Sequence, residues 1–230
     1  FFLICMGTAI AGMVGYGYGI WAPTFMVRNF DIPLAHAGLI FGISSGVFAA
    51  IGSIFSGYYC DKLSRKDSRW QLRLPVISVL ISIPFGFGFV LWPADAVWQI
   101  GNITVPHAIV FAAGFSLFNS WWPTLAYAAV SHLVSSSQRA TSVAILSLFL
   151  TLFGAGFGPL LTGTFSDIFS TGDAGEGLQI SLVIMLSLLT ISAWFYYQAI
   201  SPYQQHMDEL QADKDSSNDT ATMGTQSPVA

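Results

Sequence analysis

The chain has 230 residues, of which 53% are hydrophobic and only 9% are charged, and its formal net charge is -4. An ordinary soluble domain carries about 25% charged residues, so the composition excludes a water-soluble globular protein and favours an integral membrane protein. The two cysteines, Cys5 and Cys60, provide neither a disulfide framework nor a CxxC metal site. We expect no metal, no cofactor and no nucleic-acid partner.

Intervals free of charged residues predict six transmembrane helices. A charged side chain at the bilayer centre costs about 2.5 to 3.5 kcal/mol, and about 20 apolar residues cross the hydrocarbon core. The predicted helices occupy residues 1–27, 35–60, 74–93, 105–130, 140–166 and 178–200. The expected fold is therefore an all-α membrane bundle over residues 1–200, followed by a disordered tail over residues 201–230 that is poor in apolar periodicity.

The basic residues gather at one end of this predicted bundle. With six helices, seven of the eight Lys and Arg residues lie on one side and Arg28 lies on the other. Short loops rich in Lys and Arg stay in the cytoplasm, so the loop 58–73, Arg139 and the C-terminal tail are expected to be cytoplasmic. Three tryptophans then lie at the outer helix ends, where an interfacial aromatic belt is expected: Trp21, Trp92 and Trp98.

The second predicted helix ends in Gly57-Tyr58-Tyr59-Cys60-Asp61-Lys62-Leu63-Ser64-Arg65-Lys66, the pattern G-x-x-x-D-K-x-x-R-K. Asp61 lies at a helix C-terminus, where the macrodipole disfavours a carboxylate, so it needs a basic partner such as Lys62 or Arg65. Arg139, at the start of the fifth helix, is disfavoured for the opposite reason. The alternative interpretation is that these bases only set the topology and contact anionic lipid headgroups.

This pattern resembles the cytoplasmic loop signature of the major facilitator superfamily, except that Ser64 stands where the family usually has Gly. The segments Lys66-Asp67-Ser68-Arg69-Trp70 with Pro75, and Arg139-Ala140-Thr141-Ser142-Val143-Ala144 with Gly154, Gly158-Pro159, Gly163 and Ser166-Asp167, are similar to the spinster-like branch. The resemblance implies that residues 1–200 are helices 7 to 12, the C-terminal half of a transporter. It also implies that five residues contribute to a cytoplasmic gate: Gly57, Asp61, Lys62, Arg65 and Arg139.

The resemblance further implies secondary transport of a small organic, amphiphilic or lipid-like, substrate by alternating access, in the bacterial cytoplasmic membrane. Because the chain opens Phe1-Phe2-Leu3-Ile4 without an initiator Met or a basic leader, we expect it to be a fragment whose partner is a missing N-terminal six-helix half. A coupling proton or other ion is left open. The alternative hypothesis is a non-transporting half-molecule that acts as a membrane scaffold or partner subunit.

Aromatic and polar residues near the middle of the fourth helix predict a substrate cavity. There, Asn119, Ser120, Trp121 and Trp122 precede Pro123, which removes a helical hydrogen bond and is expected to kink the helix. An intramembrane amide beside aromatic rings is typical of a cavity wall. The first helix contributes three further candidates after a Gly-rich run: Tyr16, Tyr18 and Trp21. Ordinary packing between helices is the alternative for both groups.

Small residues at four-residue spacing predict close helix packing. They are Gly38, Gly42, Gly46 and Ala50 in the second helix and Gly154 and Gly158 in the fifth. The segment 42–46 also matches the protease pattern G-x-S-x-G, but His107 and His132 are expected near the membrane surfaces, out of reach of Ser44. We therefore predict no catalytic residue and no enzyme.

Overall fold

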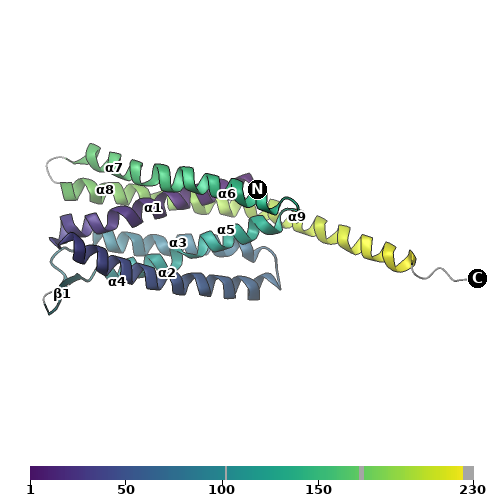
Figure 1. Cartoon of the computed structure of the whole chain (residues 1–230), viewed down its shortest axis with the longest axis horizontal. Helices are drawn as coiled ribbons and strands as arrows, with labels where there is room; N and C mark the ends of the chain where they lie inside the picture. The colour runs from purple at the N-terminus through teal and green to yellow at the C-terminus, as the bar shows by residue number, and fades with distance from the viewer. Residues whose placement is uncertain (102, 171–173, 225–230) are drawn as a thin grey trace, which may run out of the picture.

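The computed structural model describes residues 1–101, 103–170 and 174–224, and it confirms an all-α bundle of six long rods (Figure 1). Three rods are single helices: α1 (Phe2–Phe30), α2 (Leu34–Ser64) and α3 (Trp70–Leu91). The other three rods are each built from consecutive helices. The fourth rod consists of α4 (Ile109–Asn119) and α5 (Trp121–His132), and the fifth of α6 (Arg139–Phe149), η1 (Leu150–Phe157) and α7 (Gly158–Phe169). The sixth consists of α8 (Ala174–Ser187) and α9 (Leu189–Gly224). Within the described residues, five helices are long and apolar enough to cross a membrane.

The fourth rod is divided at Ser120, which separates α4 from α5. Pro123 has no N–H group, so the carbonyl of Asn119 cannot accept the usual hydrogen bond from four residues ahead. The break lies at the position where the proline was expected to disturb the helix. Each piece is too short to cross a membrane by itself, although the two together have membrane length.

Two other segments are not regular α-helix: one lies within the fifth rod and the other is the loop after α3. The segment η1 is a π-helix inserted between α6 and α7. The loop carries a hairpin in which β1 (Val97–Ile100) pairs antiparallel with β2 (Ile103–Pro106). Gly101 turns this hairpin at a φ of 62°, a backbone conformation that glycine adopts without steric cost. The predicted helices 74–93 and 105–130 leave this segment as a loop, and no strand is predicted in it from the sequence.

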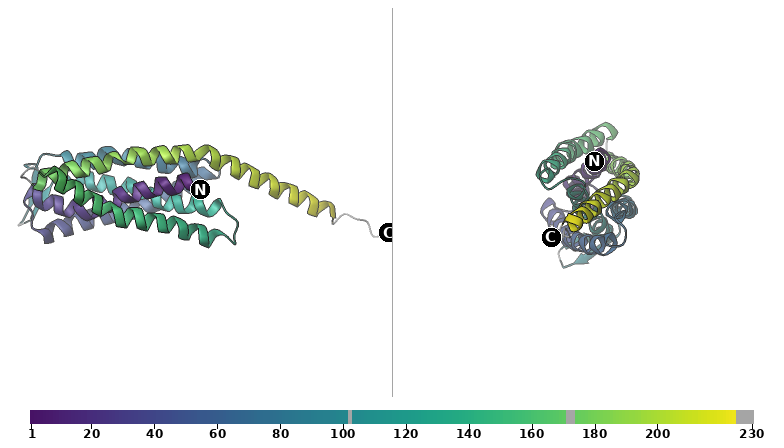
Figure 2. Two further views of the ribbon diagram at one scale, coloured as in Figure 1. Left: turned by 90° about the horizontal axis from the view of Figure 1, so that it is seen from above. Right: turned by 90° about the vertical axis from the view of Figure 1, so that its right-hand side faces the viewer.

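The last helix extends past the predicted boundary at residue 200, and residues 201–224, expected from sequence to be disordered, continue α9. Packing against the bundle holds the first part of this extension. Tyr203 is only 2% exposed and donates a hydrogen bond to Gln71 at the start of α3, so the helix is held well beyond residue 200. Farther on, α9 projects from the bundle (Figure 2). Residues 225–230 of the predicted tail lie outside the described residues.

Hydrogen bonds from buried side chains join helices that are distant in sequence. The hydroxyls of Thr8 and Tyr196 lie 3.0 Å apart, and Ser192 donates to the carbonyl of Gly7 at 2.8 Å. Both contacts join α1 to α9, and Ser181 joins α8 to α7 by donating to the carbonyl of Thr162 at 2.6 Å. In a bilayer such bonds add to van der Waals packing in holding helices together.

The glycines of the fifth rod allow α7 to approach α1 closely, as predicted. A β-carbon on Gly158 would collide with the carbonyl oxygen of Met13, and one on Gly17 would lie 2.5 Å from the hydroxyl of Thr162. The glycines of α2 that were also predicted to pack closely do not contact another helix. Nothing lies within 4 Å of a β-carbon built on Gly38, Gly42 or Gly46, so no helix of the described chain packs against this stripe of α2.

We predict that Gly158→Ala destabilises the bundle by about 1 to 3 kcal/mol, because the added methyl group meets main chain that cannot move aside. The free energy of unfolding in mixed detergent micelles measures the effect. Gly156→Ala is the matched control, since its new methyl group would have its nearest neighbour at an ordinary 3.7 Å. Equal stability of the two variants would contradict the close main-chain contact.

Candidate functional site

An apolar cavity of about 420 Å³ lies near the middle of the rods, between α1, α2, α4 and α5. A small-molecule site in a protein usually has a volume of about 300 to 1,000 Å³, so this one has the size for a small organic ligand. The lining residues are Gly15, Tyr16, Tyr18, Gly19, Phe41, Ser45, Gly46, Ala49, Phe115, Ser116, Asn119, Ser120, Trp122, Pro123 and Leu150. None of them is charged at neutral pH.

The structure brings five of the seven predicted cavity residues together in this lining: Tyr16, Tyr18, Asn119, Ser120 and Trp122. The other two have different surroundings. The indole N–H of Trp21 donates to the carbonyl of Pro159 at 2.9 Å and ties α1 to α7. The ring of Trp121 stacks on Tyr59 of α2 with a centroid distance of 6.1 Å. For these two tryptophans, the alternative of helix packing describes the structure better.

Several lining residues were not predicted, and four of them come from α2: Phe41, Ser45, Gly46 and Ala49. Phe41 and Phe115 contact the ring of Tyr18 at centroid distances of 5.9 and 4.3 Å, and Phe89 completes the aromatic cluster at 5.5 Å. Ser45 belongs to the protease-like pattern that had been set aside. In sequence these residues look like any other part of an apolar span, so hydropathy offers no signal that separates them from lipid-facing neighbours.

Three polar side chains of the cavity wall form hydrogen bonds within the fourth rod. The hydroxyl of Ser120 donates to the carbonyl of Leu117 at 3.0 Å. The indole N–H of Trp122 donates to Oδ1 of Asn119 at 3.2 Å. These bonds hold the side chains at the α4–α5 break, where the main chain has lost a hydrogen bond of its own. The wall is therefore rigid, aromatic and uncharged.

The predicted gate residues lie at the basic end of the bundle, but they do not pair with one another. Asp61 and Lys62 are in the last turn of α2, Arg139 begins α6, and all three are exposed. The ammonium group of Lys62 lies 5.8 Å from the centroid of the Tyr58 ring. Among the described residues Asp61 has no ion pair, so the expected pairing with Lys62 or Arg65 is not formed within this half.

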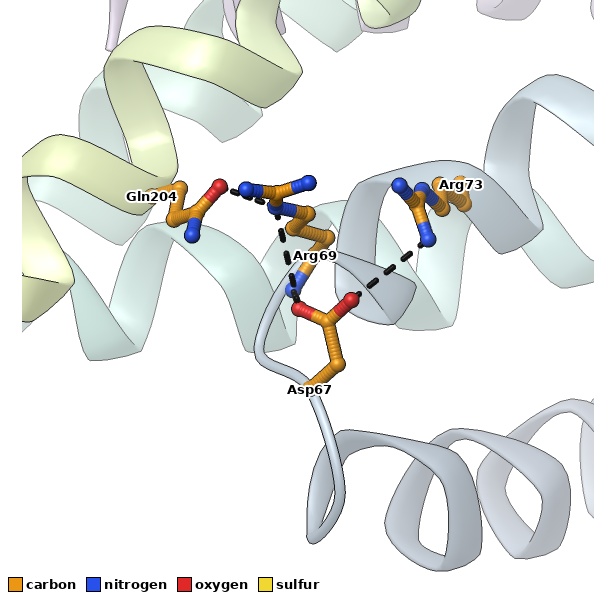
Figure 3. A network of polar contacts seen from close by, with 4 residues as sticks. All are labelled: Asp67, Arg69, Arg73 and Gln204. Atoms are coloured by element: carbon orange, nitrogen blue, oxygen red, sulfur yellow. Dashed lines mark hydrogen bonds and ion pairs between the residues drawn. The ribbon is translucent and has the colours of Figure 1, made fainter.

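The ion pairs of the basic loop instead centre on Asp67, as Figure 3 shows. Its Oδ2 atom lies 3.4 Å from Nη1 of Arg73, and its Oδ1 atom accepts the main-chain N–H of Arg69 at 2.9 Å. The guanidinium Nε of Arg69 donates to the side-chain oxygen of Gln204 on α9. Arg69 and Arg73, interpreted from sequence as topology markers, thus also order the loop.

The C-terminal helix joins the two loops at this end. Tyr203 and Gln204 bond to Gln71 and Arg69 of the α2–α3 region, while the ring nitrogen Nε2 of His206 lies 3.1 Å from the carbonyl of Leu133, just after α5. We call residues 203–206 the α9 clasp. Each of these hydrogen bonds contributes about 0.5 to 1.5 kcal/mol net, so the clasp depends on several weak contacts together.

We predict that the double variant Tyr203→Phe/Gln204→Ala loosens the clasp. Two hydrogen bonds worth about 0.5 to 1.5 kcal/mol each are lost, so amide hydrogen exchange at residues 201–209 and 67–71 should accelerate several-fold. Gln205→Ala is the matched control because Gln205 is exposed. Unchanged exchange in the double variant would show that the clasp does not restrain this end.

Comparisons with known proteins agree with this architecture. No protein-family model matches the chain. A protein of Mycolicibacterium smegmatis described as an MFS-type efflux pump is 25% identical over 211 residues, which are 91% of this chain and 46% of that protein. The chain therefore spans about half the length of this relative.

Two crystal structures of a bacterial homologue of the human lysosomal transporter Spinster are similar to the bundle. The inward-facing occupied form matches with a TM-score of 0.70 and the inward-facing unoccupied form with 0.75, each at 23% identity. The matches cover 86% and 89% of this chain and 48% of the solved chain in both cases. The chain is thus similar in sequence to an MFS-type efflux pump over about half of that protein, and its fold is that of one half of the solved Spinster homologue.

Proposed function

We propose that the chain is the C-terminal half of a secondary transporter that works by alternating access on a small organic, amphiphilic substrate. The observation that carries this proposal is the uncharged aromatic cavity of about 420 Å³ midway along the rods. Secondary transporters bind their substrates near the bilayer midplane, where two repeats meet and rock against each other. A cavity at that depth, in a fold that matches half of such a protein, supports this role.

The exposed faces of two rods support a second half as the partner. In the most apolar 18-residue stretch of each span, only 11% of the residues are buried in α2 and 17% in the α6–α7 rod, against 44 to 56% in the other three spans. The face of α2 also carries the open stripe Gly38, Gly42 and Gly46. Small residues permit close helix approach in lipid, so we propose that an N-terminal six-helix half packs here.

The chemistry of the lining favours an uncharged or amphiphilic substrate over an ion. A charged group buried without a partner costs several kcal/mol, and no lining residue supplies a countercharge. Aromatic walls bind apolar groups by burial and ring contacts. Any coupling proton or other ion would therefore need a site outside this cavity wall, in the other half.

The loop at the basic end supports a gate that closes against that half. Asp61 is exposed and has no ion pair among the described residues, so a basic group of the partner could reach it. The excess of Lys and Arg at this end supports a cytoplasmic location for loop 58–73 and the C-terminal end of α9, in a bacterial inner membrane.

We predict that Gly46→Leu in the full-length parent blocks transport while leaving the fold intact. Gly46 lines the cavity, and nothing lies within 4 Å of a β-carbon at this position, so the new side chain should occupy the space of the substrate. Efflux of neutral fluorescent amphiphiles from proteoliposomes should fall at least about 10-fold, the equivalent of roughly 1.4 kcal/mol.

Gly38→Leu is the matched control, since Gly38 has the same open surroundings in α2 but does not line the cavity. Equal loss in both variants would assign the defect to packing along the glycine stripe. Absence of transport by the unsubstituted parent across a broad panel of amphiphiles would overturn the proposal and favour a membrane scaffold.

We predict that Asp61→Asn slows transport more than it lowers stability, because an exposed carboxylate contributes little to folding but would pair across the closed gate. Transport rate and melting temperature in the same preparation measure the two effects. Asp95→Asn, which changes an exposed carboxylate at the opposite end, is the control. Unchanged transport in Asp61→Asn would leave the loop as a topology signal only.

A further inference from the structure

We infer that Tyr18, Ser45 and Asn119 form a group of hydrogen-bond donors for an acceptor oxygen on an otherwise apolar, uncharged ligand. This inference rests on the proposed function, since the ligand would be the transported substrate. It goes further by naming the chemical group that the site recognises and the residues that select it.

Two hydroxyl groups at the cavity are buried and unpartnered. Tyr18 is 2% exposed, and neither its Oη atom nor the Oγ atom of Ser45 has a hydrogen-bond partner among the described residues. They come from different helices, α1 and α2, and both residues line the cavity. Leaving a buried donor unsatisfied costs about 1 to 3 kcal/mol, so an acceptor that reaches either hydroxyl from the cavity, after a turn of the side chain, would relieve that cost.

Asn119 supplies the third donor. The indole N–H of Trp122 can only donate, so its 3.2 Å contact assigns the amide oxygen of Asn119 to that bond. The amide nitrogen is then directed away from Trp122. It lies near α1, because a β-carbon built on Gly15 would be 3.2 Å from it. With the oxygen engaged, Asn119 offers the cavity N–H groups.

Neighbouring hydroxyl groups do have hydrogen-bond partners, so the lack of a partner distinguishes Tyr18 and Ser45 from them. Ser44, beside Ser45 in α2, donates to the carbonyl of Phe41 at 3.2 Å, and Ser120 donates to Leu117 at 3.0 Å. Serines in membrane helices commonly satisfy themselves in this way. Three other buried unpartnered polar atoms among the described residues belong to side chains outside the cavity lining: Asn29, His107 and Trp121.

The donors define the ligand's polar group. An amide N–H cannot accept a hydrogen bond, whereas a tyrosine or serine hydroxyl can also donate, so an acceptor such as a ketone, ester or amide carbonyl suits each of the three. A carboxylate would also accept, but the lining that this half supplies holds no cation to offset its charge. This half therefore favours a neutral ligand, with an apolar body against the rings of Phe41, Phe115 and Trp122.

A matched pair of probes tests this recognition directly: a difluorobenzophenone, and the bis(fluorophenyl)methane that replaces its carbonyl by a methylene. Binding of each to the full-length parent in lipid nanodiscs is followed by fluorine NMR, with empty nanodiscs to correct for partition into lipid. The expected result is saturable binding of both, with the ketone roughly 2- to 12-fold tighter, the equivalent of one net hydrogen bond. Tyr18→Phe and Ser45→Ala should each reduce this preference while leaving affinity for the methane probe unchanged.

Ser44→Ala is the matched control, because it removes a hydroxyl that is already bonded within α2 and should keep the full preference for the ketone. Equal binding of the two probes by the unsubstituted protein, or an undiminished preference in both Tyr18→Phe and Ser45→Ala, would overturn the inference. So would the absence of saturable binding of either probe. Transport without a preference for the ketone would remove this inference alone, whereas a preference without transport would remove the proposed function.

Discussion

The close approach of α1 to the fifth rod determines where the other elements can lie. Main chain meets main chain where Met13 and Gly17 of α1 face Gly158. Because no side chain intervenes there, α1 is held deep in the bundle, with α9 and α8 also against it. The same short stretch of α1 contains Tyr16 and Tyr18, so the contact that anchors the helix also places the aromatic wall of the cavity.

The membrane-spanning part has few polar side chains, and several of them connect helices. Ser181, Ser192 and Thr8 bond across helices and hold the rods in register. Five buried side-chain polar atoms have no hydrogen-bond partner among the described residues, and two of them, on Tyr18 and Ser45, belong to residues that line the cavity. Water is absent from the hydrocarbon core, so these two groups depend on a ligand for a hydrogen bond.

The basic end has a different physical character. Its contacts join exposed charges and amides of Asp67, Arg69 and Gln204, in surroundings where each ion pair is weak. The α9 clasp lies there because Tyr203 is buried against the start of α3. Sequence composition suggested disorder for this segment, since polar residues dominate after residue 200, but one buried aromatic side chain and its partners were enough to continue the helix.

The sequence by itself determined the number of helices, their approximate limits and the end at which the basic residues gather. These properties follow from the cost of placing a charge in lipid, which each residue incurs regardless of its neighbours. Only the tertiary structure decided which faces are buried: that Trp122 lines the cavity while Trp21 and Trp121 pack between helices, and that Ser45 differs from Ser44. Lipid tails and protein interiors are equally apolar, so hydropathy cannot distinguish a side chain that faces a ligand from one that faces the membrane.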